Sequence, residues 1–480
     1  MHPPSSGADA IVVGSGPNGL VAAVTLARAG WHVTVIEAAD HIGGGLRSEP
    51  LTRRGFVHDV CSAVHPLALA SPALRDLPLL DHGVRWCRPD VALAHPLDGG
   101  RAAVLSGAVD DTAAGLGADG AAYRALMGPL VDHAPALVDA MLSPISVPRS
   151  PFALGRFGMV AIRSAAKLAR ARFATDEAQA LLGGVAAHAM LPLDAPATAG
   201  YGLFLAMLGH HVGWPVVAGG SQRIADALVA ILAQHGGDVV TGNEVTSLAQ
   251  LPPARAVLLD LTPRQVLRIV DGELPTRYAN ALARYRYGAG VFKVDWALDG
   301  PVPWTASDAR RAVTVHLGGT LGEIAASEAE VHAGRHPERP YVIFVQPTVV
   351  DASRAPNGKH VAWAYCHVPN GSTRDCTSQI EAQVERFAPG FRDLVVDRHV
   401  MNTVALEAHN ANYVGGDING GTGDLRQLVT RPVMSLRPWV TPRRGLYLCS
   451  SSTPPGGGVH GMCGWHAARA VLRRERGGSA

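Results

Sequence analysis

Apolar and polar positions follow two different patterns near the start of the chain. The apolar run AIVV at residues 10–13 predicts a buried parallel strand. A helical pattern follows at residues 20–29 and is ended by Gly30, and WHVTVIE at residues 31–37 predicts a second strand. Strand, helix and strand in this order predict a βαβ unit with a parallel sheet, and therefore an α/β fold.

The central part of the chain has other patterns. Residues 120–210 are mainly helical in pattern, and TSQIEAQVERFA at residues 377–388 predicts a further helix. Four apolar segments predict strands of a mixed or antiparallel sheet, at residues 290–298, 312–318, 340–350 and 360–369.

The loop after the first strand contains GSGPNG, with glycines at positions 14, 16 and 19. The first glycine allows a tight turn, the second lets the backbone approach a pyrophosphate, and the third allows close contact between helix and strand. The amides at the start of the next helix would face the phosphates. Glu37 ends the second strand, where a carboxylate can accept both ribose hydroxyls and would repel a 2'-phosphate. The motif therefore favours FAD or NAD over NADP.

A second glycine cluster, at residues 43–45, favours FAD over NAD. FAD binds in an extended form, and its second phosphate and ribitol need close contact with the backbone. Arg47 follows the cluster and can donate a charge-assisted hydrogen bond to a phosphate or a substrate, or form an ordinary surface ion pair.

The C-terminal segment GLYLCSSSTPPGGGVHGMCGWHAARAVL predicts a strand, a tight turn and a helix. Glycines 456–458 let the backbone approach a flat group, and the positive end of the helix dipole would point at it. For a flavin this is the N1–C2=O edge, where negative charge develops on reduction. The alternative is a glycine turn that only caps the helix.

In this order along the chain, the motifs resemble those of the phytoene-desaturase-like branch of the glutathione-reductase-type FAD superfamily, which also contains amine oxidases. Within it, the chain looks closest to pyridine nucleotide-disulfide oxidoreductase domain proteins. Residues 218–248 are similar to the family's returning helix and strand, with Val245 on the adenine side, and residues 256–267 to the strand that leads back to the cofactor. Residues 407–421 and the C-terminal motif extend the resemblance over the chain. Many relatives have Gly-Gly-Arg after the acid, whereas GGGLR places Arg47 two positions later.

The resemblance implies a Rossmann-like FAD-binding domain made of residues 1–75, 215–285 and 430–480. An α+β substrate domain, with a mixed sheet and helices, would consist of residues 76–214 and 286–429. FAD would be bound non-covalently. The expected cofactor-binding residues are Gly14, Ser15, Gly16, Pro17, Asn18, Gly19, Glu37, Ala38, Gly44, Gly45, Leu46, Arg47, Val245, Gly457, Gly458, Val459 and His460.

A flavin under an apolar helical domain implies hydride transfer to flavin N5 from a hydrophobic, isoprenoid- or polyene-like substrate. Desaturation also removes a proton, so one general base would help, and His65 and His460 are the candidates. His409 and Asn412 are candidate pocket residues. Each of the histidines also fits a different role, a hydrogen bond within a partly buried loop.

Three alternatives to a desaturase or dehydrogenase stay open: a flavin-dependent isomerase, an amine oxidase, and an interaction protein with a structural FAD. For an amine oxidase, Tyr447 and Trp465 are the aromatic residues near the C-terminal motif. Cys449 and Cys463 flank that motif, and buried thiols are expected there rather than covalent links to the flavin. The electron acceptor would be oxygen, a quinone or another protein, and no metal site is expected.

The composition of the chain limits the kinds of partner and the location that we expect. The chain has 480 residues with a net charge of +2 and 5% aromatic residues, which does not favour nucleic-acid binding. The N-terminus has no signal-like apolar segment, no apolar run approaches the roughly 20 residues of a membrane span, and the six cysteines form no CxxC pair. A reduced, cytoplasmic location is therefore expected.

Residues 154–172 predict one basic amphipathic helix. Its basic face would hold Arg156, Arg163, Lys167 and Arg170, and its apolar face Phe157, Val160, Ala161 and Leu168. Such a helix can lie on anionic lipid and give peripheral membrane contact, or it can cover the domain core with a solvated outer face.

Overall fold

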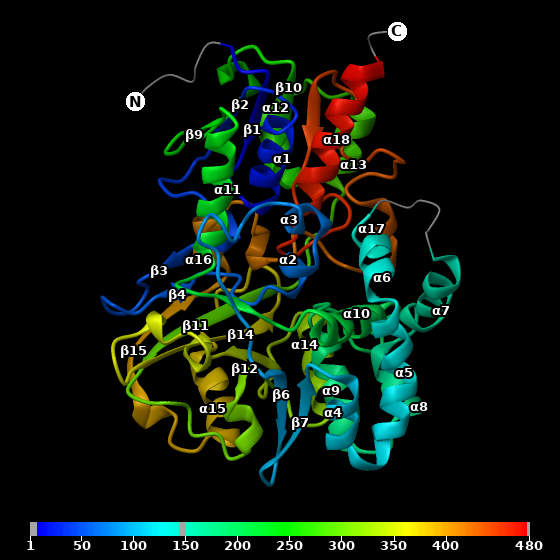
Figure 1. Ribbon diagram of the computed structural model, residues 1–480, viewed down its shortest axis with the longest axis vertical. Coiled ribbons are helices and arrows are strands. Elements are labelled where there is room, and N and C mark those ends of the chain that lie inside the picture. The colour runs from blue at the N-terminus through cyan, green and yellow to red at the C-terminus, as the bar shows by residue number, and fades with distance from the viewer. Residues whose placement is uncertain (1–6, 144–149, 478–480) are drawn as a thin grey trace.

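The computed structural model describes residues 7–143 and 150–477. Its upper part in Figure 1 contains a five-stranded sheet in the order β16-β10-β1-β2-β9, in which every pairing is parallel. The strands come from the beginning, middle and end of the chain: β1 (Ala10–Val13), β2 (Val33–Ile36), β9 (Asp238–Val240), β10 (Ala256–Leu259) and β16 (Leu446–Leu448).

Alternate residues of these strands enter two different cores. Ala10 and Val12 pack with α1 (Pro17–Ala27), α11 (Gln222–Gln234) and α18 (Met462–Gly477). Ile11 and Val13 face the opposite side, toward α12 (Pro263–Val270) and α13 (Thr276–Ala283). Burial on both faces explains the continuous apolar run AIVV.

The lower part contains a seven-stranded sheet in the order β15-β11-β14-β13-β12-β6-β7. Only the β12–β6 pairing is parallel, so this sheet is mixed. One face packs on α15 (Thr377–Phe387), and the other on α9 (Asp176–Ala187) and α14 (Leu321–His332). The strands are β6 (Val91–Leu97), β7 (Arg101–Ser106), β11 (Gly290–Leu298), β12 (Ala312–Leu317), β13 (Val342–Val345), β14 (His360–Val368) and β15 (Val395–Met401).

Shorter elements connect these layers. The helices are α2 (Pro66–Ala70), α3 (Pro72–Arg75), α4 (Val109–Gly115), α5 (Gly120–Asp132), α6 (Ala134–Met141), α7 (Pro151–Ala161), α8 (Ala165–Arg172), α10 (Thr198–His211), α16 (Thr403–His409) and α17 (Leu425–Thr430). The remaining strands form the pairs β3 (Ser48–Glu49) with β4 (His58–Asp59) and β5 (Trp86–Cys87) with β8 (Val216–Val217).

The α/β class predicted from the sequence is confirmed. β1 and β11 have the predicted bounds, whereas α1 begins earlier, at Pro17, because Gly16 is extended and proline is favourable in the first helical turn. The hairpin of β6 and β7 was not predicted. The strands of the two sheets come from the segments assigned to the two domains, and the domain boundaries themselves stay a prediction.

The single helix expected at residues 154–172 is wrong. Two helices, α7 and α8, occupy this stretch, because the Ser164 hydroxyl accepts the Lys167 amide hydrogen at 3.1 Å and begins a new helix. The four basic side chains are exposed, while Phe157 and Leu168 are buried. Within the described residues, no helix is both long and apolar enough to cross a bilayer.

Candidate active site

Three glycine-rich segments meet beside the start of α1. The Gly43 amide donates to the backbone oxygen of Ser15 at 3.1 Å and to its hydroxyl at 3.2 Å. A Cβ atom at Gly44 would lie 3.1 Å from the backbone of the first glycine loop, and one at Gly464 would overlap the carbonyl oxygen of Asn18. The absence of side chains therefore lets remote segments of the chain touch one another here.

One cavity borders this meeting point. Part of its lining, the glycine-loop wall, consists of Gly16, Pro17, Asn18, Gly45, Asp260, Asn412, Gly458 and Val459. Another part, the sheet wall, consists of Thr314, Ile343, Val345, Trp363 and Tyr365. His188 and Trp214 also line the cavity.

The sheet wall is one face of the seven-stranded sheet. Thr314 pairs with Val345, which pairs with Trp363, and Ile343 pairs with Tyr365. Directly paired residues, and residues two positions apart on a strand, point to the same face of a sheet. The Trp363 and Tyr365 rings stack with centroids 5.9 Å apart and planes 10° apart. The buried Trp363 indole nitrogen and Thr314 hydroxyl have no hydrogen-bond partner among the described residues.

Glu37 supports the glycine-loop wall from behind. Its carboxylate accepts hydrogen bonds from the Ser15 amide at 2.8 Å, the Ser15 hydroxyl at 2.6 Å and the Ala39 amide at 2.9 Å. Arg47 lies 3.6 Å from Glu37 and donates to the carbonyl oxygen of His409 at 3.2 Å. Arg47 is therefore engaged with Glu37 and is not among the residues that line the cavity.

Asp260 is a residue of this wall that the sequence reasoning missed. It follows β10, and its Oδ2 accepts the Gly19 amide hydrogen at 2.9 Å. Burial raises the pKa of Asp260 to about 7, against the opposing effect of the Gly19 amide, and Glu37 adds to the rise. Asn412 fixes the same turn, because its Nδ2 donates to the Asp260 carbonyl at 2.9 Å and its Oδ1 accepts the Thr262 amide hydrogen at 2.9 Å. The available signal in the sequence was an acid directly after the apolar run AVLL at residues 256–259.

The two histidines expected to act as bases lie elsewhere. His65 Nε2 is 2.8 Å from the Ser221 hydroxyl. His460 Nδ1 accepts the Met462 amide hydrogen at 3.0 Å, and its Nε2 is 3.2 Å from the carbonyl oxygen of Gly456. Burial lowers the pKa of each to about 4, and neither lines the cavity. Both side chains thus make structural hydrogen bonds in this packing, and a role for either as a general base stays a prediction.

Among the described histidines, His188 does line the cavity. Its Nε2 is 3.0 Å from Nε2 of the buried His316, and burial lowers the pKa of His188 to about 3. His409 does not line the cavity, whereas Asn412 does. His188 follows a helix rather than a motif, so nothing in the sequence separated it from the other histidines.

The remaining expected residues support the loops or lie outside them. Leu46 is fully buried, Ala38 is exposed, and Val245 packs in the second core of the five-stranded sheet. A Cβ atom at Gly457 would lie 2.8 Å from the carbonyl oxygen of Asn419. Outside the cavity lining lie two buried thiols and two aromatic residues from the C-terminal region: Cys449, Cys463, Tyr447 and Trp465.

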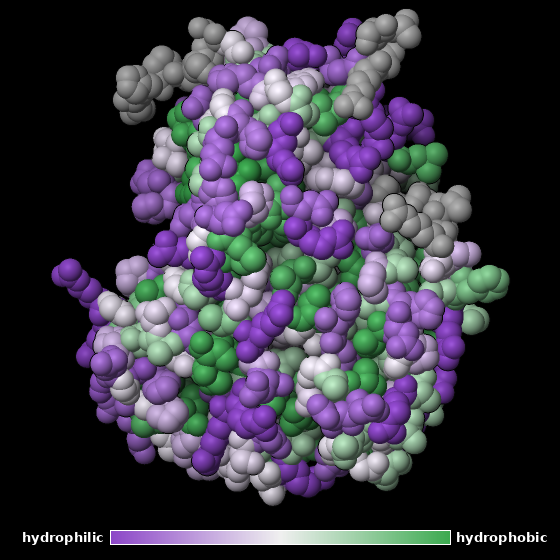
Figure 2. Space-filling view, in the orientation of Figure 1, coloured by the Kyte–Doolittle hydropathy of each residue, from purple (hydrophilic) through white to green (hydrophobic). Residues whose placement is uncertain are grey.

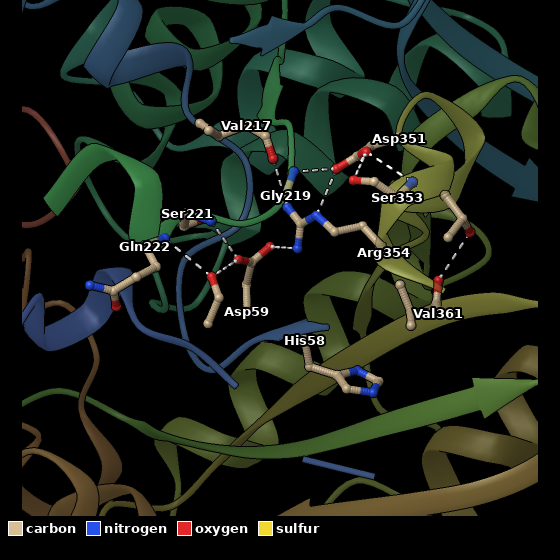
Figure 3. Close-up of polar contacts among 12 residues, drawn as sticks. His58, Asp59, Val217, Gly219, Ser221, Gln222, Asp351, Ser353, Arg354 and Val361 are labelled. Carbon is tan, nitrogen blue, oxygen red and sulfur yellow. Dashed lines mark hydrogen bonds and ion pairs between the residues drawn. The ribbon is translucent and has the colours of Figure 1, made fainter. Parts of the chain in front are cut away.

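A buried ion-pair network, which we call the junction, joins the segments around Asp59, Val217 and Arg354 (Figure 3). Arg354 donates to Asp59 at 2.9 Å, to Asp351 at 2.8 Å and to the carbonyl oxygen of Val217 at 2.9 Å. Asp59 also accepts the Ser221 amide hydrogen at 2.8 Å. Both Arg354 and Asp59 are essentially inaccessible to solvent, so the network fixes how these loops meet.

Comparisons with known proteins agree with this architecture. A family model described as an NAD(P)-binding Rossmann-like domain matches residues 12–78. Pyridine nucleotide-disulfide oxidoreductase domain-containing protein 2 of Rattus norvegicus is 26% identical, over 97% of this chain and 93% of that protein. A limonene dehydrogenase component from Castellaniella defragrans is 35% identical over 99 residues, or 21% of this chain and 18% of that protein.

Among solved structures, cyclohexylamine oxidase from Brevibacterium oxydans has a TM-score of 0.61 and 15% sequence identity, over 98% of this chain and 99% of that one. At this identity the likeness shows the fold alone. The rat protein is similar over nearly its whole length, so the likeness is not limited to the glycine motif. The chain therefore has the fold of cyclohexylamine oxidase and is similar over nearly its whole length to a pyridine nucleotide-disulfide oxidoreductase domain-containing protein.

Proposed function

We propose that the cavity binds FAD non-covalently against the glycine-loop wall and an apolar substrate against the sheet wall. The glycine-loop wall suits FAD because bare backbone at Gly16 and Gly45 borders the cavity, and Glu37 lies behind the same loop. The side-chain Oδ1 of Asn18 is buried and has no partner among the described residues, so it offers a polar contact to a ligand.

The observation that carries the substrate proposal is the sheet wall itself. Ile343, Val345, Trp363 and Tyr365 give a largely apolar surface of aliphatic and stacked aromatic side chains. It fits an isoprenoid- or polyene-like molecule, as in the phytoene-desaturase-like branch. The short match to the limonene dehydrogenase component supports a hydrocarbon substrate.

FAD, when bound, supplies an acceptor for hydride from a substrate C–H bond. The sheet wall excludes water and orients the substrate, and the unpaired Trp363 indole N–H can bind an oxygen atom of a substrate that carries one. His188 lines the cavity, and it is the protein group that we propose to receive the proton in a desaturation, although the burial that lowers its pKa to about 3 opposes this role.

A second candidate function is amine oxidation. Two stacked aromatic rings in the sheet wall can hold an alkyl amine, and the solved structure reported above is a cyclohexylamine oxidase. Against it, the sheet wall contains no carboxylate that would pair with an ammonium group.

Anaerobic mixing of the FAD-loaded protein with monoterpenes, longer polyenes and primary amines tests both functions. We expect terpenes or polyenes to bleach the flavin absorbance and amines to leave it unchanged. Trp363→Phe removes the indole N–H but keeps a ring, and an oxygen-bearing substrate should then reduce the flavin about tenfold more slowly. An oxidised spectrum with every hydrocarbon would contradict the leading proposal, and bleaching by amines alone would establish the second.

We also propose that α7 gives peripheral contact with an anionic lipid surface. Phe152, Met159 and Ile162 are 92%, 71% and 55% exposed, and Arg156 and Arg163 are exposed beside them. Figure 2 shows hydrophobic residues protruding at the edge where Figure 1 places α7. Exposed apolar side chains among arginines suit an anionic bilayer. Changing the three apolar residues to serine should abolish co-sedimentation with phosphatidylglycerol vesicles; equal binding by this variant would contradict the proposal.

A further inference from the structure

Asp260 stands where the end of β10 meets the glycine loop and the cavity. Its side chain is buried, its Oδ2 accepts the Gly19 amide hydrogen at 2.9 Å, and it lines the cavity beside Gly16 and Pro17. A Cβ atom at Gly16 would lie 2.7 Å from the same Oδ2. The carboxyl group therefore covers the bare backbone that would contact a bound pyrophosphate.

The groups that face Asp260 provide no free positive charge. Glu37, at the end of β2, raises its pKa, and the buried thiols of Cys449 and Cys463 lie near enough to feel its charge. The guanidinium of Arg47 is already 3.6 Å from Glu37. Among the residues that the structure describes, no arginine, lysine or histidine forms an ion pair with Asp260. Two acids and one guanidinium thus surround a site for two phosphate groups.

Asn18 gives a second, independent sign that a ligand contacts this wall. The residue is 4% exposed and lines the cavity, and its Oδ1 has no hydrogen-bond partner among the described residues. A buried acceptor without a donor is unfavourable, so this end of the cavity is prepared for a ligand group that donates a hydrogen bond.

We propose that Asp260 binds the FAD pyrophosphate as a neutral carboxylic acid, with Oδ2 keeping the Gly19 amide hydrogen and the acid proton donated to a phosphate oxygen. At alkaline pH, FAD binding then takes close to one proton from solvent into the protein. An ionised Asp260 would instead place a carboxylate against the phosphates with no cation between them. This inference rests on the proposed FAD site and adds a pH dependence to it.

The direction of the pH dependence follows from the charge of Asp260 in the two states. Burial raises the pKa of Asp260 to about 7 without FAD, and phosphate charges would raise it further. Below pH 7 the acid is largely neutral already, so FAD affinity changes little. Above pH 7 binding requires proton uptake, and the Kd is expected to rise about tenfold between pH 7 and 8.5.

The test is titration of the FAD-free full chain with FAD at pH 6, 7 and 8.5, followed by quenching of flavin fluorescence. In Asp260→Asn, the amide oxygen can accept the Gly19 hydrogen and the NH2 group can donate to phosphate. This variant should keep tight binding and change its Kd by less than about twofold over the same range. Asp238→Asn removes an exposed carboxylate from β9 of the same sheet and should keep the dependence of the wild-type protein.

Calorimetry on the wild-type protein needs no variant to fold. At pH 8, binding heats in two buffers of different ionisation enthalpy should report uptake of close to one proton per FAD. A Kd of the wild-type protein that is constant from pH 6 to 8.5, or an unchanged pH dependence in Asp260→Asn, would overturn the inference. Failure to bind FAD even at pH 6 would instead remove the proposed FAD site, so the two failures are distinguishable.

Discussion

The two walls of the cavity are built by different physical means. The glycine-loop wall forms where segments of the chain touch because glycines lack side chains, and its polar side chains are two amides and one acid. The sheet wall consists of side chains from β12, β13 and β14, aligned by pairing between strands. The first wall suits a ligand with fixed phosphate geometry, whereas the second can change its specificity one side chain at a time. The proposed cofactor binding and the proposed substrate choice would therefore be separable in this fold.

The largest expected effect comes from adding one methyl group at the meeting of the glycine segments. In Gly464→Ala, the new Cβ would overlap the carbonyl oxygen of Asn18, so α18 must move away from α1. We expect loss of bound FAD and destabilisation by about 3 kcal/mol or more, since backbone cannot yield as a side chain can. FAD content per chain and urea unfolding measure the two effects.

Gly158→Ala is the matched control for that change. Gly158 is also helical, in α7, and a Cβ atom there meets nothing within 4 Å. This variant should retain FAD and gain up to about 1 kcal/mol, because alanine is the better helix former. If the two alanine variants behaved alike, the close packing of α18 on α1 would not be what holds the glycine-loop wall.

The buried ion-pair network around Arg354 should give the next largest effect. Arg354→Met leaves Asp59 buried without its ion-pair partner, which costs about 3–5 kcal/mol in such settings. The double variant Asp59→Asn/Arg354→Met should recover part of this loss. Urea unfolding of each variant gives the free energies.

Arg53→Met serves as the control for the junction. Arg53 pairs with Asp397 at 3.6 Å on the surface, with more than half of its side chain exposed. Its loss should cost less than about 1 kcal/mol. Equal losses in Arg53→Met and Arg354→Met would mean that the buried network contributes no more than a surface pair.

The glycine-loop wall could be predicted because its signals are local. The spacing of the first glycine motif indicated Gly16, the second glycine cluster indicated Gly45, and the resemblance added Asn18; all three line the cavity, and their contact with the cofactor stays a prediction. Asp260 was missed because its position at the cavity depends on the pairing of β10 with β1. These two strands are far apart in the sequence.

The sheet wall could not be assembled from the sequence for the same reason. The strands of Thr314, Ile343 and Trp363 were each predicted, but the order of strands decides which residues share a face and what covers them. His65 and His460 were predicted to be bases because they stand close in sequence to the glycine motifs. The sequence gives no other indication of their distance from the flavin. In the fold, His65 contacts Ser221 of the junction instead of the cavity.

The smallest expected effect tests that reassignment of His65. Burial lowers the pKa of His65 to about 4, so the unfolded chain binds more protons than the folded one between pH 6.5 and 4, and stability falls as the pH drops through this window. His65→Gln cannot take up a proton but can still bond to Ser221. Its free energy of unfolding should fall by about 1–2 kcal/mol less than that of the wild-type protein between pH 7 and 5.

The exposed control His41→Gln should follow the wild-type protein, and flavin reduction should persist in both variants. A loss of flavin reduction in His65→Gln, with FAD still bound, would return His65 to the reacting part of the cavity and contradict its assignment to the junction.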